Sequence, residues 1–253
     1  MERFMPHKRW AINIDIEGFS KLFKWKQSKA IEPLRELMEA VFLIGQNCYP
    51  KRTERIFAHQ IVDGFIIVSG FGGDTFEMPV AVSIALLRHV AAGGKGFAKA
   101  SIGEGDSADY TGCYPQQVLD ARENVYPDGR EKRGRVRMGG GKMTLFTVFG
   151  TAHIDAYEVY KKSPSGSLLT VASCKRDLLP KECVAKEVSC GKLLSIDWVH
   201  SDLELVHEIQ KRAGLKMPSS ENLEQLFASY IATPNRPPEH WVNSTSQLLN
   251  LSY

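Results

Sequence analysis

The segment from Arg9 to Ser20, with the sequence RWAINIDIEGFS, constrains the fold of this chain more than any other. Every second residue from Trp10 to Ile14 is large and apolar, which is the period of a β-strand with one apolar face. The strand runs into Asp15, and the chain then turns at Gly18–Ser20. Either the carboxylate caps a turn at the end of the strand, or it binds a metal ion beside backbone N–H groups that hold phosphate.

A second segment, from Arg55 to Ser69, is strand-like on both sides of Asp63-Gly64, a dipeptide typical of a two-residue hairpin turn. A hairpin turn there places Asp63 at the edge of the same sheet as Asp15. Two carboxylates at strand ends are suited to holding two divalent cations around one nucleoside triphosphate, so this pair favours the metal-site interpretation.

These residues carry a resemblance to a known family. Residues 15–20, DIEGFS, resemble the D-I-x-G-F-[ST] motif of class III nucleotidyl cyclases. Residues 62–65, VDGF, resemble the second motif of that family, with Val62 where a glycine is usual, and the order and separation of the two motifs also fit.

The resemblance implies a site for two Mn²⁺ or Mg²⁺ ions, which prefer hard oxygen ligands. Asp15 and Asp63 would bind the metal, with the carbonyl of Ile16 as a further ligand. The backbone N–H groups of Gly18, Phe19 and Ser20 would hold the β- and γ-phosphates.

The order of elements along the chain agrees with this family. Apolar spacing predicts helices over Gln27–Cys48, with Pro33 in the first turn, and over Thr75–Ala92, followed by a strand over Ala98–Glu104. With the first strand and the hairpin this is the β-α-β-β-α-β order of a ferredoxin-like core, which is also the order of the cyclase catalytic core.

The remaining elements are predicted from the same signals. They are strands over Met143–Phe149, Ser167–Ala172 and Leu193–Val199 and helices over Gly150–Lys162, Ser201–Ala213 and Ser219–Ile231, with Ser201 as the N-cap of its helix and a loop over Lys175–Lys192. We therefore predict an α+β fold: a cyclase catalytic core over residues 1–176, with an antiparallel sheet and helices on one face, and a helical appendage packed on it over residues 177–253.

The segment Gln116–Lys142 is irregular and basic. Its Gly-Gly-Gly-Lys sequence is not a P-loop, because Met143 stands where Ser or Thr is required. The segment is either a solvated loop or a source of cations, from Arg135, Arg137 and Lys142, that reach a triphosphate, in the second case across a dimer interface.

Class III cyclases stabilise the transition state with an Asn and an Arg in a G-x-x-x-N-x-A-x-R pattern. Gly150 and Ala156 fit this pattern, but Ile154 and Glu158 occupy the Asn and Arg positions. Either charge stabilisation comes from elsewhere, with Arg135, Arg137 and Lys142 as the candidates, or the enzyme works differently from its better-known relatives.

The residue four positions before the hairpin Asp helps to select the base, and it is usually Lys in adenylate cyclases and Glu in guanylate cyclases. Here it is His59, which as a neutral imidazole offers one donor and one acceptor. His59 is either a residue that reads the base or a half-buried histidine whose hydrogen bonds are satisfied within its strand.

Over most of residues 9–172 the chain looks like the pyrimidine cyclases of the Pycsar antiphage system. This resemblance implies a homodimer with sites at the interface, and synthesis of cyclic UMP or cyclic CMP that activates a separate effector.

Composition adds only broad limits. The net charge of +3 is too small to argue for nucleic acid, and no stretch reaches the roughly 20 apolar residues of a membrane span. The five cysteines lack C-x-x-C spacing, and the N-terminus lacks the apolar segment of a signal peptide. We expect free thiols and a cytoplasmic location.

The sequence thus predicts a cyclase that converts UTP into cyclic UMP and pyrophosphate. The alternatives left open are a cytidylate cyclase, an adenylate cyclase with an unusual base pocket, and a degenerate cyclase fold that senses a nucleotide without turning it over.

Overall fold

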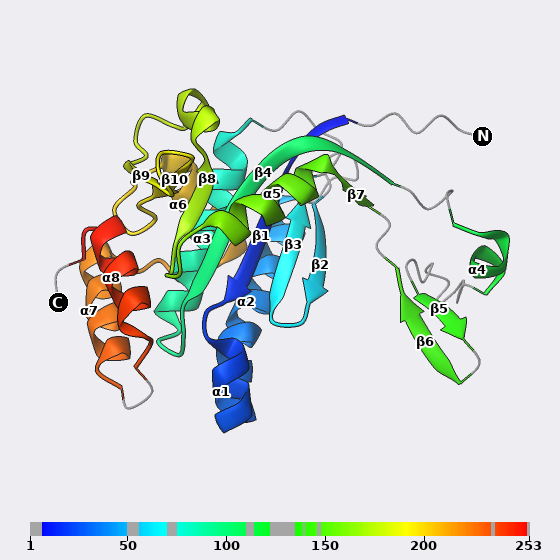
Figure 1. Cartoon of the computed structure of the whole chain (residues 1–253), viewed down its shortest axis with the longest axis horizontal. Coiled ribbons are helices and arrows are strands. Elements are labelled where there is room, and N and C mark those ends of the chain that lie inside the picture. Colours follow the sequence, from blue (N-terminus) through cyan, green and yellow to red (C-terminus); the bar gives the residue numbers. More distant parts are fainter. Residues whose placement is uncertain are drawn as a thin grey trace.

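The computed structural model describes residues 7–49, 56–69, 75–109, 114–121, 135–138, 140–145, 148–233 and 236–251. Eight strands form one mostly antiparallel sheet in the order β2-β3-β1-β4-β8-β10-β9, with β7 paired to β4 (Figure 1). The strands are β1 (His7–Ile16), β2 (Phe57–Ile61), β3 (Gly64–Val68), β4 (Ala98–Asp109), β7 (Val148–Gly150), β8 (Leu169–Ala172), β9 (Ala185–Val188) and β10 (Leu193–Ile196). The chain therefore has a mixed α+β fold, as predicted.

Helices cover both faces of this sheet. They are α1 (Phe19–Trp25), α2 (Gln27–Cys48), α3 (Glu77–Ala92), α4 (Gln116–Asp120), α5 (Thr151–Lys162), α6 (Glu204–Ala213), α7 (Ser220–Ile231) and α8 (Glu239–Leu248), with a 3₁₀ helix at Ser173–Leu178. On one face, Trp10, Ile12 and Ile14 share the main core with α2, α3 and α6 to α8, whereas Ala11 packs with α5 on the other. The expectation of helices on one face is wrong at α5, because alternate residues of β1 are buried on opposite faces.

Two glycines of β4 let α5 lie directly on the sheet. A Cβ atom at Gly103 would lie 2.1 Å from the backbone nitrogen of Ala156, and one at Gly105 would lie 2.4 Å from Oγ1 of Thr151. The hydroxyl of Ser101 donates to the carbonyl of Ala156 at 2.8 Å. Residues Asn13 and Asp15 of β1 alternate with the core residues, so they belong to the face that α5 covers.

Helix α2 has the predicted bounds, but Pro33 lies inside it. The prediction that Pro33 occupies the first turn is wrong, because the helix begins directly after Lys26 and the first turn is already complete before Pro33.

The prediction that Ser201 is the N-cap of its helix is also wrong. Helix α6 starts at Glu204, and the carbonyl of Ser201 instead accepts a hydrogen bond of 2.7 Å from the buried guanidinium of Arg88. Ser219 caps α7, and its side chain accepts a hydrogen bond of 3.2 Å from the N–H of Asn222.

Several other bounds differ from those predicted. The strand expected over Met143–Phe149 is divided between β6 (Gly141–Thr144) and β7, and β6 pairs with β5 (Arg135–Met138) in a separate two-stranded sheet. The loop expected over Lys175–Lys192 contains β9. Strand β10 pairs with β8, so the main sheet continues across residue 176.

Apolar residues of α6, α7 and α8, including Val206, Phe227 and Trp241, belong to the same core as β1. Within the described residues, no helix combines the length and the apolarity needed to cross a membrane.

Candidate functional site

The structure brings Asp15 and Asp63 together. Asp15 lies near the end of β1, where it is paired with Gly64 of β3 and Lys99 of β4. Asp63 lies in the turn between β2 and β3, and its carbonyl accepts a hydrogen bond of 3.3 Å from the N–H of Ile16. The two carboxyl groups are close enough that Asp63 raises the pKa of Asp15, in addition to the effect of burial. The central strand and the hairpin therefore converge on one pair of carboxylates.

The hairpin turn is one residue earlier than predicted. Its two loop residues are Val62 and Asp63, whereas Gly64 already belongs to β3 and pairs with Ile61. A glycine is needed there because a Cβ atom at Gly64 would lie 2.4 Å from the carbonyl oxygen of Ile14. The residue with the left-handed backbone is Val62, with φ of 53°. This is the position at which the sequence motif usually has glycine.

Burial and mutual repulsion dominate the electrostatics of the pair. Burial, followed by the proximity of Asp63, raises the pKa of Asp15 from 3.8 to about 7. Burial also raises the pKa of Asp63. Two donors act in the opposite direction on Asp15: the hydroxyl of Tyr160 donates to Oδ2 at 3.2 Å, and the N–H of Ile16 donates to Oδ1 at 2.9 Å. These hydrogen bonds hold the Asp15 carboxyl group in place, but a negative charge on both carboxyl groups at once is unfavourable.

A buried lysine that was not singled out in the sequence lies beside the carboxylates. Lys99 is 6% exposed, donates to the carbonyl of Ser163 at 3.2 Å and lies 4.6 Å from the ring centroid of Tyr160. Burial lowers its pKa, while the nearby Glu17 and Asp15 raise it. The sequence contained one signal that could have identified Lys99: it is a single lysine in a strand of otherwise small and apolar residues, Ala98–Ile102.

The turn after β1 starts a short helix. Gly18 has φ of 72° and precedes α1 without a side-chain cap. The first N–H groups of a helix have no partner within it, so those of Phe19 and Ser20 are available to an external acceptor. The side chain of Phe19 is in the core, while Ser20 is exposed. Ile16 has its side chain in the core as well.

His59 lies in β2 opposite Ile66, on the face of the sheet that α5 covers. Burial, with a smaller effect of His153 of α5, lowers the pKa of His59, so its imidazole is neutral near pH 7. A neutral ring retains one donor and one acceptor nitrogen.

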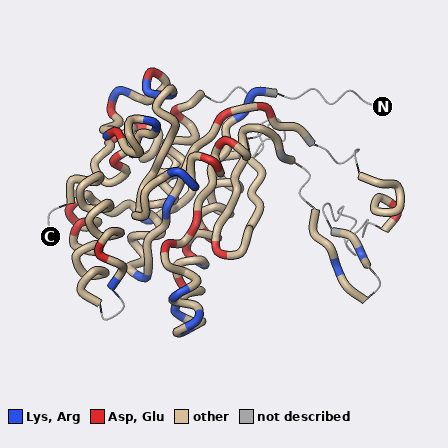
Figure 2. The backbone as a smooth tube through the Cα atoms, in the orientation of Figure 1, with Lys and Arg blue, Asp and Glu red and all other residues tan. Residues whose placement is uncertain are grey.

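The predicted cations are not near the carboxylates of their own chain. Arg137 is paired across the β5–β6 hairpin with Lys142, and Arg135 with Thr144; the side chain of Arg135 lies outside the described residues. Figure 1 shows this hairpin well apart from the strands that carry Asp15 and Asp63, and Figure 2 shows basic residues on both of its strands.

The two positions at which the family has Asn and Arg also lie away from the carboxylate pair. Ile154 is 63% exposed, and Glu158 pairs with Lys161 and Lys162 on the solvent side of α5.

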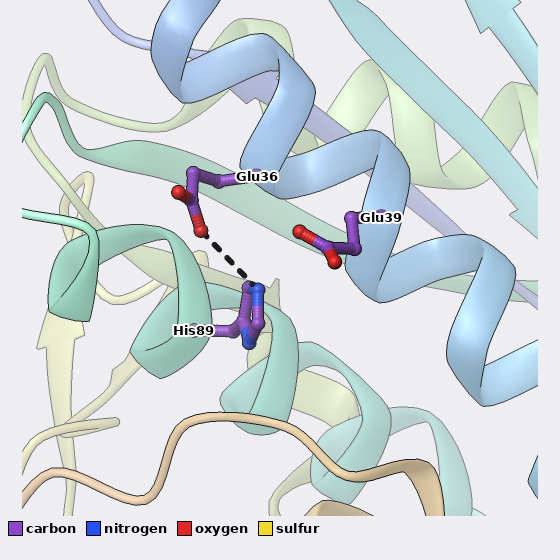
Figure 3. A group of neighbouring side chains, drawn as sticks. All are labelled: Glu36, Glu39 and His89. Carbon is purple, nitrogen blue, oxygen red and sulfur yellow. Dashed lines mark ion pairs between the residues drawn. The ribbon is translucent and has the colours of Figure 1, made fainter.

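A second group with metal-ligand chemistry lies between α2 and α3 (Figure 3). It consists of Glu36, Glu39 and His89, whose ligand atoms lie within 4.8 Å of one another. The N–H of Lys216 donates to Nδ1 of His89 at 3.1 Å, which places the proton of the neutral ring on Nε2, the atom 3.4 Å from Glu36. The ammonium of Lys216 also pairs with Glu36. This group fits a contact between α2 and α3 that Lys216, from the loop between α6 and α7, reinforces by its ion pair with Glu36, and it does not fit a metal site.

The donor set of Asp15 and Asp63 does fit Mg²⁺ or Mn²⁺. Both ligands are hard carboxylate oxygens, and the repulsion that raises the pKa of Asp15 is relieved by a cation between them. Comparison with protein-family models finds no match for this chain, and comparison with curated proteins finds no significant similarity.

Proposed function

We propose that this chain is a nucleotidyl cyclase with a class III, ferredoxin-like core, which converts UTP into 3′,5′-cyclic UMP and pyrophosphate. The observation that carries the proposal is the proximity of the Asp15 and Asp63 carboxyl groups at the junction of the central strand and the β2–β3 turn. The strand order β2-β3-β1-β4, with α2 and α3 as the connections, supports it.

The proposed reaction forms a bond between the ribose 3′-oxygen and the α-phosphorus and breaks the bond from that phosphorus to pyrophosphate. Asp15, Asp63 and the carbonyl of Ile16 would hold Mn²⁺ or Mg²⁺, which supply Lewis-acid activation of the 3′-hydroxyl and neutralise the charge on the leaving group. The N–H groups of Gly18, Phe19 and Ser20 would bind the β- and γ-phosphates. Tyr160 and Ile16 fix the Asp15 carboxylate through their hydrogen bonds. His59 would face the base.

The basic hairpin leads to the second part of the proposal. Because Arg137 and Lys142 lie on a hairpin apart from their own carboxylates, they would serve the triphosphate bound to the other subunit of a homodimer. Arg135 belongs to the same hairpin. The resemblance to the Pycsar cyclases implies that the cyclic nucleotide is a cytoplasmic signal in antiphage defence, read by a separate effector.

Incubation of the purified protein with Mn²⁺ and one of ATP, GTP, CTP or UTP, followed by mass spectrometry, tests this function. We expect cyclic UMP from UTP alone and no product from D63A. Formation of cyclic CMP or cyclic AMP would show that the substrate assignment is wrong and that the assigned reaction is right. Full turnover by D63A would show that the metal-site assignment is wrong.

A second candidate is a nucleotide sensor with a cyclase fold. The observation that favours it is the outward position of Ile154 and Glu158, which leaves the Asn and Arg positions of α5 without a cation. A chain that binds UTP with Mn²⁺ in calorimetry but releases no pyrophosphate, with Mg²⁺ as well as Mn²⁺, would be this sensor.

A further inference from the structure

The C-terminal helix α8 contacts the turn that links the metal-site strand to α1. The indole N–H of Trp241 donates to Oε2 of Glu17, a residue 224 positions away in the sequence. Glu17 follows Asp15 by two residues and directly precedes Gly18. A contact that fixes Glu17 therefore acts on the carboxylate strand and on the proposed phosphate-binding turn together.

The indole is itself held rigidly. Trp241 is 4% exposed and belongs to a cluster of four aromatic rings with Phe97, Phe227 and Tyr230. Its ring is stacked on Phe227, with centroids 6.1 Å apart and planes 19° apart. Phe97 also accepts a backbone hydrogen bond of 2.9 Å from the N–H of Glu17, so the aromatic cluster holds Glu17 through both its side chain and its backbone.

Other groups complete the surroundings of the Glu17 carboxylate. Burial raises the pKa of the Glu17 carboxyl, while the nearby buried ammonium of Lys99 lowers it. A hydrogen bond in such an enclosed place is stronger than the same bond exposed to water. With its oxygens engaged in this way, Glu17 is fixed as a support of the turn and is not a third ligand for a cation beside Asp15.

We propose that Trp241 is a positioning residue, which holds the 17–20 turn in place through Glu17 and so makes helix α8 part of the substrate-binding unit. This inference rests on the proposed function for its catalytic consequence, but the restraint on the turn is a property of the folded chain alone. Removal of the indole N–H should loosen the turn and weaken triphosphate binding while the fold persists.

The test compares W241F with W198F. Both variants keep an aromatic ring and lose a buried indole donor, since Nε1 of Trp198 donates to the carbonyl of Ser167 at 2.8 Å. Hydrogen exchange followed by mass spectrometry reads the amides of residues 16–25. We expect about tenfold faster exchange there in W241F, in proportion to the loss of one buried hydrogen bond, and unchanged exchange in W198F at a similar melting temperature.

A double-mutant cycle gives a second readout. E17A should accelerate exchange at least as much as W241F, and the double variant E17A/W241F should match E17A alone, because both changes remove the same bond. In the enzyme assay, KM for UTP should rise about tenfold in W241F with a smaller change in kcat, while W198F keeps the KM of the wild type.

Equal exchange of residues 16–25 in W241F and W198F, or additive effects of E17A and W241F, would overturn the positioning role. If the wild-type protein forms no cyclic nucleotide, the proposed function fails, and the exchange comparison still decides whether Trp241 holds the turn.

Discussion

Asp15, which we propose as a metal ligand, carries a cost in stability. Its pKa is about 7 in the folded chain against 3.8 as the ordinary value, so the folded state holds the proton more tightly than the unfolded state. In the absence of metal, the contribution of Asp15 to stability is therefore fully present below about pH 4 and is lost as the pH rises from about 4 to about 7.

We expect D15N, in the presence of a chelator, to be more stable than the wild type by about 2 to 4 kcal/mol at pH 8 and to show little difference at pH 4. Urea unfolding at the two pH values measures this difference. The exposed D177N serves as the control and should change stability equally at both pH values. A D15N gain independent of pH would show that repulsion within the carboxylate pair is not its cause.

Val62, which precedes Asp63 in the turn, has an unfavourable backbone conformation. It has φ of 53°, is 73% exposed and is β-branched, which is strained in the left-handed region. Replacement by glycine should relieve this strain and stabilise the protein by about 1 kcal/mol. The larger backbone entropy that glycine loses on folding offsets part of this gain.

The midpoint of urea unfolding measures the effect of V62G. V62A removes the same apolar branches but retains Cβ, so it should gain much less. Equal gains in the two variants would attribute the effect to the removed side chain and not to the backbone conformation.

The sequence predicted the two carboxylates because each lies at a local signal, a strand end or a hairpin dipeptide. Lys99 and Tyr160 could not be predicted in the same way. Lys99 contacts the site only because β4 pairs with β1 in a register that places it opposite Asp15. Tyr160 contacts Asp15 from a helix 145 positions further along the chain. Both depend on packing between distant segments, which local periodicity does not encode.

The contact between α5 and β4 depends on the absence of side chains on the strand. At Gly103 a Cβ atom would meet backbone atoms of α5, at 2.1 Å for the nitrogen of Ala156 and 2.7 Å for the carbonyl oxygen of Ala152. Backbone cannot move aside as a flexible side chain does, so the whole helix would have to shift.

G103A should therefore destabilise the protein by about 3 kcal/mol or more. It should also weaken the hydrogen bond from Tyr160 to Asp15, since that tyrosine is carried by the displaced helix. Chemical unfolding gives the first effect and turnover of UTP the second. G140A is the control, because a Cβ atom there meets nothing within 4 Å and should leave stability within about 0.5 kcal/mol.

The bounds of the helices were predicted better than the face of the sheet on which each helix lies. The bounds of α2 follow from its apolar period, and the end of α3 at Ala92 follows from the glycines after it. The placement of α5 on the opposite face follows from Gly103 and Gly105, whose role emerges only once β4 and α5 are in contact. Strand β9 was missed because its four residues, AKEV, have no apolar alternation of their own.

The C-terminal region shares the core of the rest of the chain. Residues of α6 to α8 pack with those of β1, and β10 continues the main sheet from β8. The sequence predicted an appendage packed on the core over residues 177–253, but it did not indicate which of its residues are buried with those of β1. The contact between Trp241 and Glu17 connects helix α8 to the turn that follows β1.

The position of the basic hairpin leads to a prediction about two copies of the chain. Asp15 and Asp63 lie side by side in one chain, whereas Arg137 and Lys142 lie on a hairpin apart from them. If the hairpin serves the site of the partner in a homodimer, D63A and the double variant R137A/K142A should each be inactive alone and active when mixed and allowed to exchange subunits.

The expected recovery follows from symmetry. In an equal mixture half of the dimers contain one chain of each kind, and one of their two sites has intact carboxylates and an intact hairpin, so about a quarter of the wild-type turnover should return. A mixture of D15A and D63A should recover nothing, because one chain supplies both carboxylates of a site. No recovery in the first mixture would mean that the hairpin acts on its own chain or takes no part in turnover, and activity of R137A/K142A alone would separate these two explanations.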